Sequence, residues 1–224
     1  MKSFFHSGSL LKEVNSTIIT LVPKVPNPFS IIEFRPIPCC NVLYKCITKI
    51  LADRLRSCLS DLISSNQTAF VKGRIISENI LLAQELLKGY HKNKGKARCA
   101  IKVDLKKAYD SVEWNFILMC LLVVGCPARF VNWVRECITT LRFSITLNGS
   151  LVGYFKGGKG LRQGDPQSLY LFVLAMEVFT KLMSAKVRES QLFQFHPHCG
   201  RQQITHLSFA DDLLIFVVVD VQSI

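Results

Sequence analysis

The stretch HLSFADDLLIF, residues 206–216, places two adjacent acidic residues between two apolar runs. We predict that Ser208–Ala210 and Leu213–Phe216 form short buried strands that meet at Asp211 and Asp212. Burying a carboxylate is costly unless something compensates its charge. Two neighbouring carboxylates also repel each other, so a bound cation is the simplest compensation. The alternative is a polar hairpin turn without a ligand, and this motif alone does not decide between them.

A second stretch, CAIKVDLKKAYDSVEW at residues 99–114, begins with an alternation of apolar and polar residues that predicts a strand. One face of this strand carries Lys102 and Asp104. If the strand neighbours the hairpin at 206–216, the carboxylates of Asp104, Asp211 and Asp212 converge. Oxygen ligands of this kind suit Mg²⁺. Two such ions roughly 4 Å apart can activate a 3′-hydroxyl and stabilise a leaving pyrophosphate.

The composition points to a polyanionic partner. Lys and Arg number 28 against 16 Asp and Glu, giving a net charge of +12, which suggests nucleic acid or an anionic membrane surface. No apolar run reaches the roughly 18 residues of a membrane span, and the start lacks a signal peptide, so we expect no membrane partner. The nine cysteines include no C-x-x-C pair and indicate buried free thiols in a reducing, intracellular compartment. HPHC at 196–199 lacks a second ligand pair, so no structural zinc is expected.

The rest of the chain predicts helices and strands in irregular order. Residues 1–40 show little pattern and include an extended loop around three prolines at 23–28. Residues 142–155 predict a hairpin turning at Asn148-Gly149. Five helices are expected: from a cap at Asn41 to Leu62, from a cap at Ser77 to about Tyr90, from Asp110 or Ser111 to near Gly125, from Pro127 onward, and from Pro166 or Ser168 to about Val187. Without regular βαβ alternation, the class expected is α+β.

Three of these segments together resemble a known family. KVDLKKAYDSV, GLRQGDPQS and FADDLLIF resemble, in order and spacing, core motifs of reverse transcriptases, above all those of LINE-type (non-LTR) retrotransposons such as plant elements. FRPIPCCNVLYKCITKILADRL and NQTAFVKGRIISENILLAQEL are similar to the same family. The resemblance implies a right-hand polymerase fold, with a fingers-like region at 1–98 and a palm-like region at 99–224. It also implies a palm whose antiparallel sheet is backed by helices.

The resemblance further implies an RNA-directed DNA polymerase that adds dNTPs to a DNA primer on an RNA template. Two Mg²⁺ ions are the implied cofactors, with Mn²⁺ as a substitute, and the nucleus is the implied location. Asp104 matches the first metal-binding aspartate and Asp211 the second, ranked above Asp212, which contributes charge and hairpin hydrogen bonds. The backbone carbonyl of Leu105 matches a further metal ligand.

Other positions match the family's nucleotide site. Tyr109 matches the residue under the sugar, although it could equally be an aromatic residue that fills the corner between strand and helix. Arg162, Gln163 and Gly164 match a nucleotide-binding loop, for which the alternative is a plain glycine turn.

Two basic residues match positions near the incoming triphosphate. Arg74, with Lys72 before it, has a planar guanidinium that suits phosphate oxygens, and the alternative is a surface salt bridge. On the primer side, Lys102 faces the acids and could contact primer or merely balance charge. Phe209 is expected near the primer end, and Asp110 is expected to cap a helix.

Two features depart from the family pattern. Gln167 stands where an apolar residue is usual, and Leu169 where proline opens the helix. The chain also ends soon after the aspartate pair, so we expect a fragment without the thumb, weakly active or inactive. The alternative function is a non-catalytic remnant that binds nucleic acid.

Overall fold

The computed structural model describes residues 1–90, 97–190, 195–196 and 198–219. The chain forms two compact units, each made of two chain segments. The first unit contains Met1–Leu55 and Tyr109–Phe172, and the second contains Arg56–Ala108 and Val173–Ile224. The units thus interleave along the sequence, and the assignment of 1–98 to fingers and 99–224 to palm stays a prediction.

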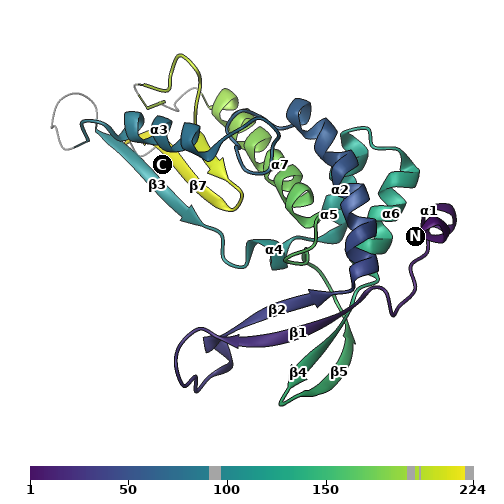
Figure 1. The fold of residues 1–224 in the computed structure, drawn as a ribbon. Coiled ribbons are helices and arrows are strands. Elements are labelled where there is room, and N and C mark those ends of the chain that lie inside the picture. The colour runs from purple at the N-terminus through teal and green to yellow at the C-terminus, as the bar shows by residue number, and fades with distance from the viewer. Residues whose placement is uncertain (91–96, 191–194, 197, 220–224) are drawn as a thin grey trace. The chain divides into compact units, whose positions relative to one another are not determined.

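A four-stranded mixed sheet forms one part of the first unit (Figure 1). Its order is β2-β1-β4-β5, with β1 at Ser16–Pro23, β2 at Phe34–Cys40, β4 at Arg142–Leu147 and β5 at Ser150–Lys156. β1 is antiparallel to β2 and parallel to β4, and β4 and β5 form a hairpin. The predicted turn is confirmed, since Asn148 and Gly149 have φ of 48° and 78°.

The strands β1 and β2 lie within residues 1–40, where the sequence shows little pattern. Ser16 pairs with Arg142, so the parallel partner of β1 lies far away in the sequence and leaves no local signal, whereas its antiparallel partner β2 is nearby. β2 contains Pro36 and Pro38, which offer no N–H group, and such residues are tolerated where a strand lies at the edge of its sheet.

The first unit also contains most of the helices. They include α1 (Lys2–Ser7), the first part of α2 (Val42–Leu62), α5 (Trp114–Val123), α6 (Ala128–Thr139) and a 3₁₀ helix at Ile31–Glu33. The cap at Asn41 is confirmed, because its Oδ1 accepts the N–H of Leu43 at 2.8 Å. The buried side chains of this unit include Tyr44, Leu51, Ile117 and Leu121.

The predicted start of α5 is wrong. Asp110 and Ser111 belong to a separate short helix, α4 (Ala108–Ser111), and α5 begins after Glu113. Helical structure is interrupted between α4 and α5. There the carbonyl of Val112 accepts the N–H of Gly160 at 2.8 Å, a partner outside either helix. Asp110 therefore does not cap α5.

The second unit contains an antiparallel sheet of order β3-β7-β6. Its strands are β3 at Arg98–Asp104, β6 at His206–Phe209 and β7 at Asp212–Val218, and its helices are α3 (Ile76–Leu87) and the larger part of α7 (Ser168–Glu189). α3 follows Ile75 without a side-chain cap, so the cap expected at Ser77 is wrong and Ser77 lies in the first turn.

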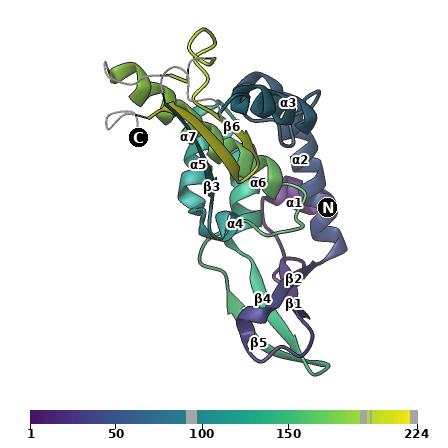
Figure 2. The ribbon, with the colours of Figure 1, turned by 90° about the vertical axis from the view of Figure 1, so that its left-hand side faces the viewer.

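Helices cover both faces of this sheet, as Figures 1 and 2 show. Leu207 and Phe216 pack in one cluster with Leu86 of α3. On the other face, His206 contacts α7 through Thr180, with 3.1 Å between His206 Nε2 and Thr180 Oγ1. The expected antiparallel sheet backed by helices is confirmed.

The structure bears on two expectations drawn from composition. α7 is long and apolar enough, by length and composition alone, to cross a membrane, although no uninterrupted apolar run predicted it. Core helices pass the same test, and Leu171, Val173 and Leu174 of α7 are almost fully buried. None of the nine cysteines, which all lie in the described part of the chain, forms a disulfide, and only Cys120, Cys137 and Cys199 are buried.

Candidate active site

The acidic residues of the second unit meet at one end of its sheet. The register places Asp104, the last residue of β3, opposite Asp212, the first residue of β7. Phe209, at the end of β6, is the other partner of Asp212. Directly opposed residues of antiparallel strands project from the same face, and Lys102 shares that face with Asp104. The predicted face carrying Lys102 and Asp104 is thus confirmed, with Leu105 next along the chain.

Asp211 lies in the turn of the hairpin rather than in a strand. The turn contains Ala210 and Asp211, and Ala210 has φ of 54°, an uncommon conformation for a residue with a side chain. Asp211 is half-buried and Asp212 exposed. The residue across from Asp104 is therefore Asp212, and the ranking of Asp211 above it as a metal ligand stays a prediction.

The charges at this sheet end are only partly balanced. Lys102 Nζ lies 3.8 Å from Asp212 Oδ1, with both side chains largely exposed, so this pair contributes at most about 1 kcal/mol to stability. Within the described residues, no group of three or more His, Cys, Asp or Glu side chains is arranged to hold a metal ion. The backbone register brings the acids together as expected, but their side chains do not form a cluster.

A groove of about 250 Å³ borders these residues between α3 and the sheet. Its lining from α3 is Ile76, Asn79, Ile80 and Ala83, and its lining from the strands includes Lys102, Phe209 and Asp212. The ring of Phe70 lies beside that of Phe209, with centroids 6.5 Å apart. The predicted primer-side residues Lys102 and Phe209 thus share one groove with Asp212.

Arg74 has a role that its sequence position did not reveal. Its guanidinium donates to the backbone carbonyls of Ile63, Ser64 and Gln67 at 2.6–2.7 Å, with a longer contact of 3.5 Å to that of Ser60. These carbonyls lie in and just after the last turn of α2, so Arg74 caps that helix end. The alternative expected for Arg74 was a surface salt bridge, but its guanidinium bonds to backbone carbonyls instead. Lys72 is exposed, and the triphosphate role of both residues stays a prediction.

In the first unit, the glycine-rich loop before α7 is fixed against α4. Leu161 donates its N–H to the carbonyl of Tyr109 at 2.8 Å, parallel to the Gly160–Val112 hydrogen bond. A Cβ atom on Gly160 would lie 2.8 Å from the backbone oxygen of Asp110, so only glycine permits this approach. Two of the sequence motifs therefore lie side by side.

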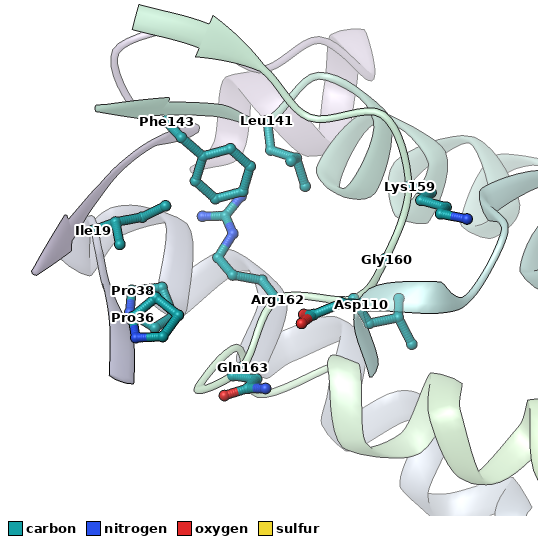
Figure 3. A pocket seen from close by; sticks show the side chains of 11 residues that line it. Ile19, Pro36, Pro38, Asp110, Leu141, Phe143, Lys159, Gly160, Arg162 and Gln163 are labelled. Carbon is teal, nitrogen blue, oxygen red and sulfur yellow. The ribbon is translucent and has the colours of Figure 1, made fainter. Parts of the chain in front are cut away.

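A small pocket of about 160 Å³ opens beside this loop (Figure 3). Its apolar wall consists of Ile19, Pro36, Pro38, Leu141 and Phe143, and its polar lining includes Asp110, Lys159 and Gln163. Lys159 also pairs with Glu113 at 3.4 Å. The volume is below the roughly 300 Å³ at which ligand pockets usually begin, so it can hold only part of a ligand.

Arg162 points into the core of the first unit. Its guanidinium donates to Asn15 Oδ1 at 2.6 Å and to the hydroxyl of Thr17, and it lies 4.3 Å from the Tyr44 ring centroid. Figure 3 shows the side chain directed toward Phe143. Arg162 is 6% exposed, so its guanidinium stabilises the loop from inside.

The other loop residues differ in exposure. Gln163 and Gly164 are exposed and remain candidates for nucleotide contact. The ring of Tyr109 stacks on Phe172, with centroids 4.4 Å apart and planes 20° apart. The structure therefore shows the aromatic packing foreseen as the alternative for Tyr109, and its contact with a sugar stays a prediction.

The departure at Gln167 lies in a buried polar cluster. Asp165 accepts the hydroxyl of Tyr44 at 2.7 Å, and burial raises the pKa of the Asp165 carboxyl. Gln167 is 1% exposed and contacts Asp165 Oδ2 through Nε2 at 3.4 Å, whereas its Oε1 is buried without a hydrogen-bond partner. The Gln167 amide is thus buried, as expected from the family pattern, which has an apolar residue at this position.

One buried residue near the acids was missed. Gln67 is 2% exposed, and its amide makes hydrogen bonds to the backbone of Ala210, next to Asp211. The only signal was its place in NQTAFVKGR, a segment similar to the family.

A family model described as "Reverse transcriptase (RNA-dependent DNA polymerase)" matches residues 22–222. The chain belongs to the reverse transcriptase family. Relatives of this reverse transcriptase chain come from LINE-type elements, as expected. It is 27% identical over 211 residues to the transposon TX1 uncharacterized 149 kDa protein of Xenopus laevis, covering 94% of this chain and 16% of the relative. It is 28% identical over 225 residues to the Pol polyprotein of the type-1 retrotransposable element R2 of Nasonia vitripennis, covering 96% and 20%.

Solved telomerase structures share the fold of this reverse transcriptase chain. Telomerase from Candida tropicalis, in complex with a fragment of telomeric RNA, matches with a TM-score of 0.60 at 14% identity over 94% of this chain and 37% of its own. Telomerase from Candida albicans matches with a TM-score of 0.59 at 13% identity over 91% and 38%. The chain thus spans less than half the length of each of these proteins.

Proposed function

We propose that this chain carries the nucleotidyl-transfer residues of an RNA-directed DNA polymerase, which extends a DNA primer with dNTPs on an RNA template. The observation that carries the proposal is the register that sets Asp104 opposite Asp212 beside the Asp211 turn, in a chain that belongs to the reverse transcriptase family. The net charge of +12 supports a nucleic-acid partner.

The carboxylates of Asp104 and Asp211, with the backbone carbonyl of Leu105, would hold two Mg²⁺ ions, for which Mn²⁺ can substitute, because hard oxygen ligands suit these cations, and Asp212 would add negative charge. When bound, such ions supply activation of the primer 3′-hydroxyl and neutralise charge on the leaving pyrophosphate. Lys102 neutralises part of the acidic charge through its pair with Asp212. Gln163 contacts the sugar or base of the incoming nucleotide, and Gly164 allows its close approach.

The test is primer extension by the purified chain with an RNA template, a DNA primer, Mg²⁺ and dNTPs. We expect incorporation to be lost in Asp211→Ala, because removing one carboxylate removes a metal ligand. Incorporation should be retained in Asp53→Ala, which removes an exposed carboxylate of α2 that forms an ion pair with Lys49.

The proposal fails if the folded chain incorporates nothing at low salt, or if Asp211→Ala is as active as Asp53→Ala. Salt-sensitive RNA binding without incorporation would favour the alternative, a non-catalytic domain that binds nucleic acid.

A further inference from the structure

We propose that Gln67 is a positioning residue that fixes the backbone of the Ala210-Asp211 turn, an inference that rests on the proposed polymerase function. Its side-chain amide contacts both polar backbone groups of Ala210. Gln67 Oε1 accepts the N–H of Ala210 at 3.0 Å, and Gln67 Nε2 donates to the carbonyl of Ala210 at 3.3 Å. One planar amide thus replaces the backbone partner that a fourth strand beside β6 would supply to this residue.

The segment that carries Gln67 is itself anchored to β6. Ser208 donates its N–H to the carbonyl of Asn66 at 2.8 Å, and Thr68 donates its N–H to the carbonyl of Ser208 at 3.2 Å. Gln67 and Ser208 accordingly form an isolated parallel bridge. Gln67 Oε1 also accepts the N–H of Ala69 at 2.9 Å, which fixes the side-chain rotamer. These hydrogen bonds therefore fix the position of the Gln67 amide independently of its bonds to the turn.

The turn needs such support. Ala210 has φ of 54° whereas Asp211 has no positive φ, and a two-residue hairpin with positive φ at its first position alone usually has glycine there. An alanine there is strained and persists only where its surroundings hold it. Since Asp211 follows directly, a change in the Ala210 backbone would redirect the Asp211 carboxylate relative to Asp104.

Gln67 is 2% exposed and its amide bonds to the backbone of Ala210, so it acts through the turn that carries Asp211. The variant Gln67→Met removes the amide while retaining the length of the side chain. Thr180→Val is a matched control, because it removes another buried hydrogen bond to β6, that with His206, without touching the turn. Gln67→Asn keeps the amide but shortens the side chain by one methylene, so it serves where Gln67→Met does not fold.

Three readouts are compared in these variants. Hydrogen–deuterium exchange follows the peptide spanning 206–216, the paramagnetic resonance of Mn²⁺ follows its binding to the chain, and primer extension gives kcat and KM. For Gln67→Met we expect faster exchange at the turn, weaker Mn²⁺ binding and a kcat lowered roughly 10- to 100-fold with KM for dNTP unchanged. Gln67→Asn should fall between Gln67→Met and the wild type.

Equal effects of Gln67→Met and Thr180→Val on the turn would overturn the inference, since loss of stability would then explain both. If Gln67→Met keeps the wild-type kcat, the inference fails while the polymerase function stands. If the wild-type chain incorporates no nucleotide, the polymerase function fails, and exchange at the turn with Mn²⁺ affinity still decides whether Gln67 fixes it.

Discussion

At the scale of single residues, a match to a family motif does not predict which way a side chain points. Arg162 matches a nucleotide-binding loop, yet its guanidinium is buried against Asn15, Thr17 and Tyr44. Gln163, its neighbour, is exposed. Periodicity cannot predict this difference, because a loop has no repeating face. The interior position of Gln167, in contrast, was predictable, since the family pattern places an apolar residue there.

Replacement of Gln167 by leucine should stabilise the chain. The buried Oε1 has no hydrogen-bond partner, and such a group costs about 1–3 kcal/mol, whereas the long Nε2 contact to Asp165 contributes less. We expect Gln167→Leu to raise the free energy of unfolding by about 1 kcal/mol, measured by urea denaturation. The control Gln163→Leu changes an exposed side chain of the same loop and should leave that free energy nearly constant. A Gln167→Leu variant less stable than the wild type would contradict this account.

At the scale of elements, the ends of helices depend on partners that come from elsewhere in the chain. Asn41 caps α2 by accepting the N–H of Leu43, only two residues further on, so this cap could be predicted from the local sequence. The same holds for the Asn148-Gly149 turn. The end of α2 depends on Arg74, and the break before α5 depends on Gly160. β1 was missed for the same reason, because a parallel pairing with the distant strand β4 leaves no local pattern, and the prolines of β2 argue against a strand.

Loss of the Arg74 guanidinium should therefore destabilise the chain rather than only weaken nucleotide binding. We expect Arg74→Ala to lower the free energy of unfolding by about 2 kcal/mol, because carbonyls after α2 lose a charged donor. Arg74→Lys should recover little of it, since an ammonium lacks the fork that reaches several carbonyls. Lys72→Ala, an exposed neighbour, should leave stability unchanged in the same thermal and urea melts. Equal stability of Arg74→Ala and Lys72→Ala would show that the cap contributes nothing.

At the scale of the whole molecule, stability should fall in mild acid. Burial lowers the pKa of His206 from 6.5 to about 4, partly offset by the Glu177 carboxylate. Because the folded pKa is depressed, the unfolded chain binds a proton first as pH falls below about 6.5. The stabilisation present above that pH, at most about 3 kcal/mol, is then lost progressively down to about pH 4.

The variant His206→Gln removes this titration, so its free energy of unfolding should decline less between pH 7 and pH 4.5 than that of the wild type. His6→Gln, which changes an exposed histidine, should follow the wild-type curve. Parallel curves for the wild type and His206→Gln would assign the acid sensitivity to other groups.

The sheet of the first unit has two unlike edges, and this governs how copies of the chain can associate. Along β2, Pro36 and Pro38 have no N–H to give to an incoming strand. β5 lacks proline, and its exposed side chains include Leu151, Val152 and Phe155. Unprotected apolar edges of this kind template strand addition. Self-association through this sheet should therefore proceed from β5 alone, which favours closed pairs of chains over growing fibrils.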